Sequence, residues 1–198
     1  MLKEVCILHQ ESEIQHSNII LVGMMGTGKT TVGTLLAQQL SYPLVDMDTI
    51  IAEREGMSVQ DIFRTKGEAY FRDLESQVLE EMLQSTGQVI STGGGCVLRE
   101  LNRAVMLAKG LVVALTADVD HIVGRVAGDT NRPLLAGDTR ERVQTIMEER
   151  KEAYHFAHVT VDTSLLTPDE VVTHVLLRYR VQASWLSGEK VKRGERYE

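Results

Sequence analysis

Cysteine is scarce in this chain, which has only Cys6 and Cys96 among its 198 residues. The two thiols lie far apart and neither belongs to a C-x-x-C pair, so the sequence predicts neither a disulfide framework nor a structural zinc site. A reducing cytosol is the simplest setting for such a protein, and we expect a cytoplasmic location.

Long apolar runs are also missing. No stretch approaches the roughly 20 apolar residues that a membrane-spanning helix needs. The first residues lack the apolar core of a signal peptide, carry early acidic side chains, and are not rich in arginine and serine as transit peptides are. We therefore expect no association with a membrane.

An excess of positive charge is absent as well. The chain has 21 lysines and arginines against 28 acidic residues, which gives a formal net charge of −7. No face is obviously basic before the last residues, which argues against a nucleic-acid partner. The six histidines show no H-x-x-x-H or H-E-x-x-H spacing, so no histidine metal centre is predicted.

The most informative segment that is present is GMMGTGKT at residues 23–30, which fits the phosphate-binding pattern G-x-x-x-x-G-K-[ST]. It follows IILV at residues 19–22, which is typical of a buried parallel strand, and it precedes an expected helix over residues 31–40. This context favours a nucleotide-binding P-loop over an ordinary glycine turn before a helix.

In a P-loop, glycines let the backbone turn tightly, and the backbone N–H groups and the helix N-terminus then face phosphate oxygens. Lys29 would reach the β- and γ-phosphates, and Thr30 would hold Mg²⁺. The ATP-binding residues that we predict in this segment are Gly23, Gly26, Thr27, Gly28, Lys29, Thr30 and Thr31.

Strand and helix patterns alternate along the chain. Further strands are expected at residues 44–46, 89–91, 111–115 and 159–162. Further helices are expected at residues 49–55, from Ser58 with an interruption at Gly67, then 68–84, 98–109, 118–127, 139–154 and from Pro168 to about Arg178. The alternation predicts an α/β P-loop NTPase fold, with a central parallel β-sheet flanked by helices on both faces.

The composition divides the chain into parts. Residues 1–17 are polar and are expected to form an N-terminal extension, the folded domain is expected over residues 18–179, and residues 180–198 are expected to be a polar tail. The polar, glycine-bounded segment at about 128–138 is expected to be a mobile lid.

Ligands of a parallel sheet gather beyond the carboxyl ends of its strands, where this sequence places carboxylates and glycines. Of Asp46 and Asp48, one carboxylate can support Mg²⁺ through water while the other faces the substrate. The alternative is that Asp48 caps the following helix. The run Gly93, Gly94 and Gly95 favours close approach of the backbone to a ligand over a merely flexible turn.

Two arginines suggest anion binding. Arg72 and Glu75 are three residues apart in an expected helix, so they form either a weak surface pair or a site in which Arg72 binds a substrate carboxylate. Arg132 lies in the expected lid, where an arginine can stabilise charge on a transferring phosphoryl group. The alternative for Arg132 is a solvated loop side chain.

Taken in order, these features resemble the shikimate kinase family, which carries G-x-M-G-x-G-K-[ST]-T, D-x-D, G-E-x-x-F-R-x-x-E, G-G-G and R-P-L-L. The corresponding segments of this chain are residues 23–31, 46–48, 67–75, 93–95 and 132–135. The resemblance covers roughly residues 18–178. It implies ATP-dependent phosphorylation of the 3-hydroxyl of shikimate in aromatic amino-acid biosynthesis, with Mg²⁺, and we expect a monomer.

The resemblance also implies roles for individual residues. The catalytic residues would be Asp48, which binds the accepting hydroxyl and acts as base, together with Lys29 and Arg132. Thr30 and Asp46 would support the metal. Within a substrate-binding region at about 46–84, Arg72 would take the shikimate carboxylate and Glu75 would orient it. Gly93, Gly94 and Gly95 would line the substrate, and Arg125 and Pro168 would lie on either side of adenine.

The chain departs from the family at one place. The family usually follows its R-x-P-L-Y motif with a second carboxylate-binding arginine two residues after the tyrosine. Residues 150–157 here read RKEAYHFA, so the proline is missing and Phe156 stands where that arginine would be. A missing guanidinium costs about 1.5–3 kcal/mol of charged hydrogen bonding. We therefore expect weaker shikimate binding, a substitute such as Arg150 or His155, or another substrate.

Two other functions stay open at this point. One is a gluconate-type sugar-acid kinase, which shares the P-loop and an anionic polyol substrate, although the Phe-Arg-x-x-Glu and triple-glycine segments are not expected there. The other is a non-catalytic relative that binds nucleotide without turnover, which the missing arginine suggests.

Overall fold

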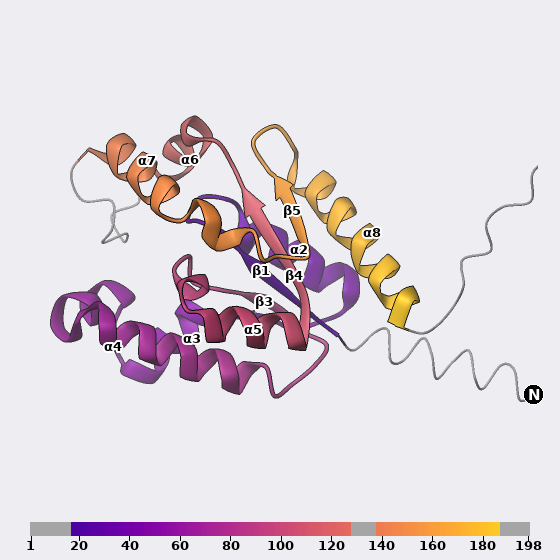
Figure 1. Ribbon diagram of the computed structural model, residues 1–198, viewed down its shortest axis with the longest axis horizontal. Helices are drawn as coiled ribbons and strands as arrows, with labels where there is room; N and C mark the ends of the chain where they lie inside the picture. Colours follow the sequence, from indigo (N-terminus) through magenta and orange to yellow (C-terminus); the bar gives the residue numbers. More distant parts are fainter. Residues whose placement is uncertain (1–16, 128–137, 187–198) are drawn as a thin grey trace, which may run out of the picture.

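The computed structural model describes residues 17–127 and 138–186, with side chains up to residue 181 (Figure 1). Its strands are β1 (Asn18–Val22), β2 (Leu44–Asp46), β3 (Val89–Ser91), β4 (Gly110–Thr116) and β5 (Val159–Asp162). They form one five-stranded sheet in the order β2-β3-β1-β4-β5, and every neighbouring pair is parallel. The predicted parallel sheet is confirmed.

The α-helices of the described residues are α2 (Lys29–Leu40), α3 (Met47–Glu55), α4 (Val59–Met82), α5 (Glu100–Lys109), α6 (Val119–Val126), α7 (Thr139–Glu149) and α8 (Pro168–Leu186). Two short 3₁₀ helices, η1 (Cys96–Leu98) and η3 (Lys151–Tyr154), follow the glycine turn and α7. The model therefore has the α/β architecture that the sequence predicts.

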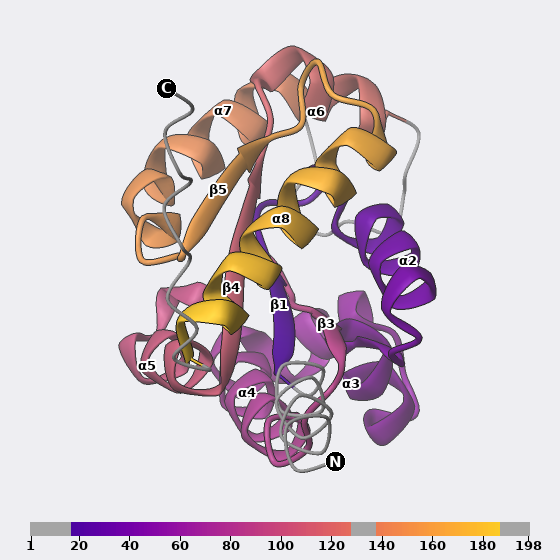
Figure 2. The same ribbon diagram turned by 90° about the vertical axis from the view of Figure 1, so that its right-hand side faces the viewer.

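Helices cover both faces of the sheet because side chains alternate along each strand. In β1, Ile20 and Val22 pack against an apolar layer from α3, α4 and α5, whereas Ile19 and Leu21 pack against α2 and α8. Figure 2 shows α8 in front of the sheet and α4 behind it. A third cluster joins α6 and α7 to Met24 of the P-loop, so the segments around the predicted lid pack directly on the phosphate-binding loop.

Side-chain caps fix where several helices begin. The expected capping patterns are confirmed at Ser58, whose Oγ accepts from the backbone N–H of Asp61, and at Thr167, which exchanges hydrogen bonds with Glu170. The alternative in which Asp48 caps its helix is wrong. Asp46 caps α3 by accepting from the N–H of Thr49, because the strand ends at Asp46.

Other helix boundaries differ from the prediction. The expected helix over 98–109 is broken at Arg99, whose backbone is extended, and the expected helix over 139–154 is broken at Arg150. The interruption expected at Gly67 is confirmed, because its backbone is non-helical, with φ of 85° and ψ of 168°, so that α4 consists of two helical segments joined by a kink. The last helix continues past Arg178 to Leu186, so the boundary expected at residue 180 falls within α8.

Some expectations fall outside the described residues. These are residues 1–16 of the extension, residues 128–137 of the lid with Arg132, and residues 187–198 of the tail. Among the helices that the structure describes, none combines the length and the apolar character that crossing a bilayer requires.

Candidate active site

The P-loop connects β1 to α2 with the backbone conformation that its glycines permit. Gly23, Gly26 and Gly28 have φ of 145°, 77° and 92°, a region that other residues rarely adopt. A Cβ on Gly23 would also overlap the carbonyl of Leu115 in β4, whereas the space beside Gly28 is open. The loop therefore sits tightly on the sheet at one end and faces open space where α2 begins.

Lys29 and Thr27 bond to backbone carbonyls of the P-loop, whereas the threonines that follow in α2 are exposed. The Nζ of Lys29 donates to the carbonyls of Gly23 at 2.8 Å and Met24 at 3.0 Å, so its ammonium lies across the loop. Thr27 is buried, and its Oγ1 donates to the same Met24 carbonyl at 2.8 Å, which makes its side chain part of the loop framework. Thr30 and Thr31 are exposed in the first turn of α2.

Arg125, expected beside adenine, is fixed against the P-loop. Its Nη1 donates to the carbonyl of Gly26 at 3.2 Å and to Oγ1 of Thr163 at 3.0 Å, and its Nη2 donates to the carbonyl of Thr163 at 2.7 Å. The Thr163 hydroxyl also lies within hydrogen-bond distance of the Thr27 and Thr116 carbonyls. Sequence reasoning missed Thr163, although its position directly after β5 could have identified it. Pro168 is exposed at the start of α8.

The glycine turn after β3 brings the other predicted residues together. A Cβ on Gly93 would lie 2.5 Å from Oε1 of Glu75 and 2.9 Å from Oδ1 of Asp48, and one on Gly95 would overlap the guanidinium of Arg72. A Cβ on Gly94 would lie 3.4 Å from the Gly23 carbonyl of the P-loop. Three residues without side chains therefore let the P-loop, Asp48 and the Arg72–Glu75 pair meet at one edge of the sheet.

The Arg72–Glu75 pair is not the weak surface pair that the sequence left open. Arg72 is 8% exposed and Glu75 is 0% exposed, and Nη1 of Arg72 lies 2.5 Å from Oε2 of Glu75. Nη2 of Arg72 lies 2.9 Å from Oε1 of Glu68, whose side chain is more than half exposed. The guanidinium carbon also stands 5.7 Å from the Phe63 ring and 5.5 Å from the Phe71 ring.

Burial governs the electrostatics of this pair. Burial raises the pKa of Glu75 from 4.5 to about 7, although Arg72 opposes the shift, and the nearby Asp48 adds to it. Oε1 of Glu75 has no hydrogen-bond partner among the described residues. Burial also works against the charge of Arg72, but Glu75 and Glu68 outweigh it, so the pKa of Arg72 is raised and the guanidinium stays charged.

The two aspartates after β2 have separate environments. Asp46 is partly buried, and its Oδ1 accepts from the N–H of Thr49 at 3.1 Å and from its Oγ1 at 3.2 Å. Asp48 is exposed in the first turn of α3, with Oδ1 beside Gly93. The strand ends at Asp46 as expected, and Asp48 already belongs to the helix, which begins at Met47.

Of the two expected substitutes for the missing arginine, the structure brings one to the site. Arg150 is 7% exposed and its Nη1 donates to the carbonyl of Gly94 at 3.2 Å. His155 is exposed and pairs with Glu152 at 2.8 Å, and Phe156 packs at the rim of the apolar layer under α4. Tyr154, to which sequence reasoning gave no role, donates to the same Gly94 carbonyl at 2.8 Å.

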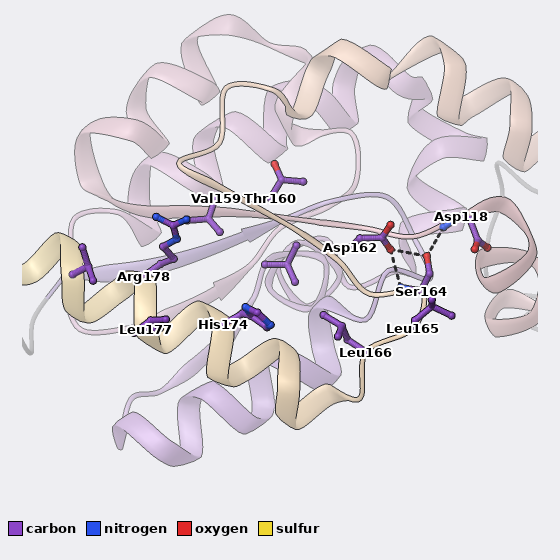
Figure 3. A pocket seen from close by; sticks show the side chains of 12 residues that line it. Asp118, Val159, Thr160, Asp162, Ser164, Leu165, Leu166, His174, Leu177 and Arg178 are labelled. Atoms are coloured by element: carbon purple, nitrogen blue, oxygen red, sulfur yellow. Dashed lines mark hydrogen bonds between the residues drawn. The ribbon is translucent and has the colours of Figure 1, made fainter.

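A cavity of about 840 Å³ lies elsewhere, between β5 and α8 (Figure 3). Its polar lining includes Asp118, Asp162, Ser164 and Arg178, and Ser164 Oγ bridges Asp162 and the N–H of Asp118. None of the predicted site residues lines it. Since β5 and β2 are opposite edges of the sheet, this cavity is far from the corner that holds Asp46 and Asp48.

A P-loop that faces a carboxylate and a buried arginine across a glycine turn is the arrangement of a kinase acting on a small anionic molecule. The chain matches the family model described as shikimate kinase over residues 25–180. It is 42% identical to a shikimate kinase of Geobacter sulfurreducens over 159 residues, which is 80% of this chain and 88% of that protein. The chain belongs to the shikimate kinase family.

Solved structures agree with this assignment. Shikimate kinase from Acinetobacter baumannii, in complex with shikimate, has a TM-score of 0.82 and 32% identity, and the match covers 87% of this chain and 98% of that chain. The enzyme from Aquifex aeolicus has a TM-score of 0.70 and 34% identity, over 84% of this chain and 98% of that chain. A gluconokinase from Sinorhizobium meliloti, at 21% identity and a TM-score of 0.56, shares the fold.

Proposed function

We propose that this chain transfers the γ-phosphoryl group of ATP to the 3-hydroxyl of shikimate, giving shikimate 3-phosphate and ADP. The observation that supports the proposal is the glycine turn, which approaches the P-loop at Gly94 and approaches Asp48 and the Arg72–Glu75 pair at Gly93 and Gly95. Membership of the shikimate kinase family supports the same reaction. The pathway served is aromatic amino-acid biosynthesis.

Phosphoryl transfer depends mainly on positioning and on stabilising charge. Asp48 would accept a hydrogen bond from the 3-hydroxyl and take its proton as the new oxygen–phosphorus bond forms and the bond to ADP breaks. Lys29 would turn from the loop carbonyls that hold it now to the β- and γ-phosphates. The carbonyls of Gly23 and Met24 are backbone acceptors, which are weaker partners for an ammonium than phosphate is.

Arg72 would bind the substrate carboxylate through its planar guanidinium. Glu75 and the two phenylalanine rings hold the guanidinium from the buried side, and Glu68 neutralises it from the exposed side. The substrate carboxylate would take the place of Glu68, whose exposed side chain can move into solvent at little cost. Arg150 would supply the second cation, in place of the arginine that Phe156 replaces.

The residues present fit ATP and Mg²⁺. Open space beside Gly28 leaves room for a phosphate against the start of α2, and Thr30 and Asp46 offer oxygen ligands. No group of three or more His, Cys, Asp or Glu side chains that could hold a metal occurs in the described part of the chain, so phosphate and water would complete the coordination. When bound, Mg²⁺ would neutralise charge on the phosphates.

Further parts of the proposal rest on the family pattern. Arg125 and Pro168 would flank adenine, and Arg132 of the lid at about 128–138 would face the transferring group. The kinase domain would begin at residue 18, include the whole of α8 to Leu186, and act as a cytoplasmic monomer without nucleic-acid or membrane partners.

The direct test is ADP release with ATP and Mg²⁺, measured with shikimate, with gluconate and without acceptor. We expect shikimate to raise ADP release at least tenfold over the other two conditions. Equal stimulation by gluconate would favour a sugar-acid kinase. ATP binding without any acceptor-dependent turnover would favour the non-catalytic alternative.

A variant pair tests the role of Asp48. Asp48→Asn should lower kcat by a factor of about 100 or more, the range of general-base and positioning effects, while calorimetry shows unchanged ATP binding. Asp73→Asn changes an exposed aspartate that pairs with Arg99, so it should leave kcat as in the wild type. Full activity of Asp48→Asn would remove Asp48 as the base.

A further inference from the structure

The cavity between β5 and α8 runs along an open edge of the sheet (Figure 3). β5 is the last strand in the sheet order and, among the strands that the structure describes, it pairs only with β4. All four of its residues, Val159–Asp162, line the cavity. Because successive side chains of a strand point to opposite faces, a cavity that meets all four lies beside the outer backbone of the strand. Such an edge offers hydrogen-bonding groups to another extended segment.

Apolar side chains flank this edge. Leu177 and Val181 of α8 line the cavity and are 62% and 43% exposed, and Leu165, which also lines it, is 89% exposed. A segment that pairs with β5 would cover these side chains at the same time, and the burial of apolar surface is favourable.

Charges divide the cavity into a basic end and an acidic end. Figure 3 shows Arg178 beside Val159 at the start of β5, whereas Asp118 and Asp162 lie toward the end of the strand. Within the part of the chain that the structure describes, the Arg178 guanidinium forms no ion pair. Oδ1 of Asp162 accepts from the N–H and the Oγ of Ser164, both of which are neutral donors. A segment with acidic side chains at the first end and a basic side chain at the second would match these charges.

The chain enters the fold next to the basic end. Ser17 directly precedes β1, its Oγ donates to Oη of Tyr179 at 3.1 Å, and that hydroxyl donates to the Ser17 carbonyl at 3.0 Å. Tyr179 is the neighbour of Arg178 in α8. If the chain before Ser17 lies along β5, the part nearest Ser17 is at the basic end and earlier residues are at the acidic end. Such a segment runs antiparallel to β5.

One continuous apolar run occurs in the otherwise mostly polar residues 1–16. Residues 5–8 read VCIL, and valine and isoleucine favour extended strands. The run has the same length as β5.

The charges on either side of this run fit the cavity in the antiparallel direction. Glu11 and Glu13 follow the run, so they fall at the basic end. Lys3 and Glu4 precede it and fall at the acidic end. Since neighbouring side chains of a strand point to opposite faces, Lys3 can face the aspartates while Glu4 points away.

The connection is long enough to reach the edge. A strand beyond β5 lies three strand positions from β1, which is about 14 Å. Through Val113, Val159 is level with Leu21, four residues beyond Ser17, which is about 13 Å along the strands. The direct distance is therefore about 19 Å, and the nine Cα steps from Leu8 to Ser17 span up to about 30 Å.

Residues 187–198 fit this edge less well. They contain four lysines and arginines and no run of apolar residues. They follow α8, whose last turns lie beyond Arg178, so they would bring like charge to the basic end.

We propose that residues 5–8 of this chain form a sixth strand, antiparallel to β5 and packed on Leu177 and Val181, and that this strand closes the edge of the sheet. The covered edge is then closed to strands of other chains. This pairing goes beyond the proposed function and does not depend on it, and no part of its test uses activity.

Hydrogen exchange followed by mass spectrometry in the full chain tests the pairing. We expect the amides of residues 5–8 to exchange at least tenfold more slowly than in a synthetic peptide of residues 1–16. The protection should be the same when the protein is diluted tenfold, because the contact lies within one chain. Exchange at the rate of the peptide would overturn the proposal. Protection that disappears on dilution would also overturn it, since the edge would then be covered by a second copy.

A charge reversal tests where the segment lies. Arg178→Glu should speed the exchange of residues 5–8 about two- to fivefold, the effect of one exposed ion pair. Arg180→Glu changes an exposed arginine of the same helix that does not line the cavity, so it should leave the exchange as in the wild type. Equal exchange rates in the two variants would overturn the placement of the segment on this edge.

Cys6 lies within the run and gives a direct measure of proximity. In Leu177→Cys, a short bismaleimide should link the new thiol to Cys6 within one chain, as found by peptide mapping. Leu101→Cys, at a position 79% exposed on α5, should give no such link, and the buried Cys96 should not react. Absence of the link in Leu177→Cys, or equal yields in both variants, would overturn the proposal.

Discussion

Arg72 and Glu75 form an ion pair that the fold buries beneath Gly95, with 2.5 Å between Nη1 and Oε2. A buried pair of this kind adds little net stability, but removing one partner strands the other charge and costs about 3–5 kcal/mol. Replacing either residue by alanine would therefore lower stability as well as substrate binding, and the two effects could not be told apart. Variants that keep the charge or the shape of the side chain allow binding to be measured separately from folding.

Arg72→Lys should raise KM for shikimate by a factor of about 10 to 100, because an ammonium cannot bind a carboxylate through the two parallel bonds that a guanidinium makes. KM for ATP should change less than threefold. Steady-state kinetics with each substrate varied in turn would check both values.

Arg99→Lys is the matched control for Arg72→Lys, since Arg99 pairs with Asp73 at the surface. It should behave as the wild type. If Arg72→Lys raised KM for ATP as much as KM for shikimate, recognition of the carboxylate by Arg72 would be refuted.

Gly95→Ala should impair both folding and acceptor binding for a steric reason. The backbone of Gly95 has φ of −103°, which alanine adopts freely, so any effect comes from the overlap of the new methyl group with the Arg72 guanidinium. We expect a loss of about 1–3 kcal/mol in the free energy of unfolding and a raised KM for shikimate. Urea unfolding and kinetics would measure the two effects.

Gly124→Ala serves as the comparison, because Gly124 lies within α6 with open space around it. That variant should gain up to about 1 kcal/mol of stability from higher helix propensity. Similar behaviour of the two variants would show that Gly95 is not required for close packing against Arg72.

Thr163→Val should weaken ATP binding rather than acceptor binding. The change keeps the shape of the side chain but removes the hydroxyl that accepts from Arg125 and contacts the P-loop carbonyl of Thr27. We expect KM for ATP to rise about three- to tenfold and KM for shikimate to stay within twofold. Isothermal titration with a non-hydrolysable ATP analogue would confirm the site of the effect.

The control for this change is Thr173→Val, which removes an exposed hydroxyl bonded to a carbonyl within α8. ATP affinity should not respond to it. An unaltered ATP affinity in Thr163→Val would mean that Arg125 is positioned by its backbone contacts alone.

The fold was largely predictable because apolar runs and turn residues report local structure. The runs at residues 19–22 and 111–115 identified the two central strands, and the capping patterns at Ser58 and Thr167 identified helix starts. The end of α8 was not predictable in this way. Tyr179 is buried through contacts with Tyr42 and Ser17, 137 and 162 residues away in the chain, so tertiary packing extends the helix.

The same contrast between local motifs and long-range contacts explains which parts of the site could be predicted from the sequence. The P-loop, Asp48, Arg72 and the glycine turn belong to local motifs, and the family resemblance they carry is confirmed. Thr163 and Tyr154 were not assigned roles because their partners, Arg125 and Gly94, lie 38 and 60 residues away. The burial of the Arg72–Glu75 pair could be recognised only from the tertiary structure, since helix spacing alone cannot distinguish a surface pair from a buried one.

The buried carboxyl of Glu75 should make stability depend on pH. Its pKa is about 7 in the folded protein, against 4.5 for the exposed group, chiefly because of burial. The folded state therefore holds this proton more tightly than the unfolded state does. Its contribution to the free energy of unfolding is fully present below pH 4.5 and is lost as the pH rises to about 7.

Glu75→Gln keeps the shape and an oxygen acceptor for Arg72 but cannot ionise, so this pH dependence should disappear. Urea unfolding at intervals between pH 4.5 and 8 would give the free energy of unfolding for each protein. The difference, wild type minus variant, should fall as the pH rises through 7 and level off above it. Glu80→Gln changes an exposed glutamate of the same helix and should retain the wild-type dependence. A difference between wild type and Glu75→Gln that stays constant with pH would show that Glu75 is ionised throughout, and that Arg72 outweighs the cost of burying it.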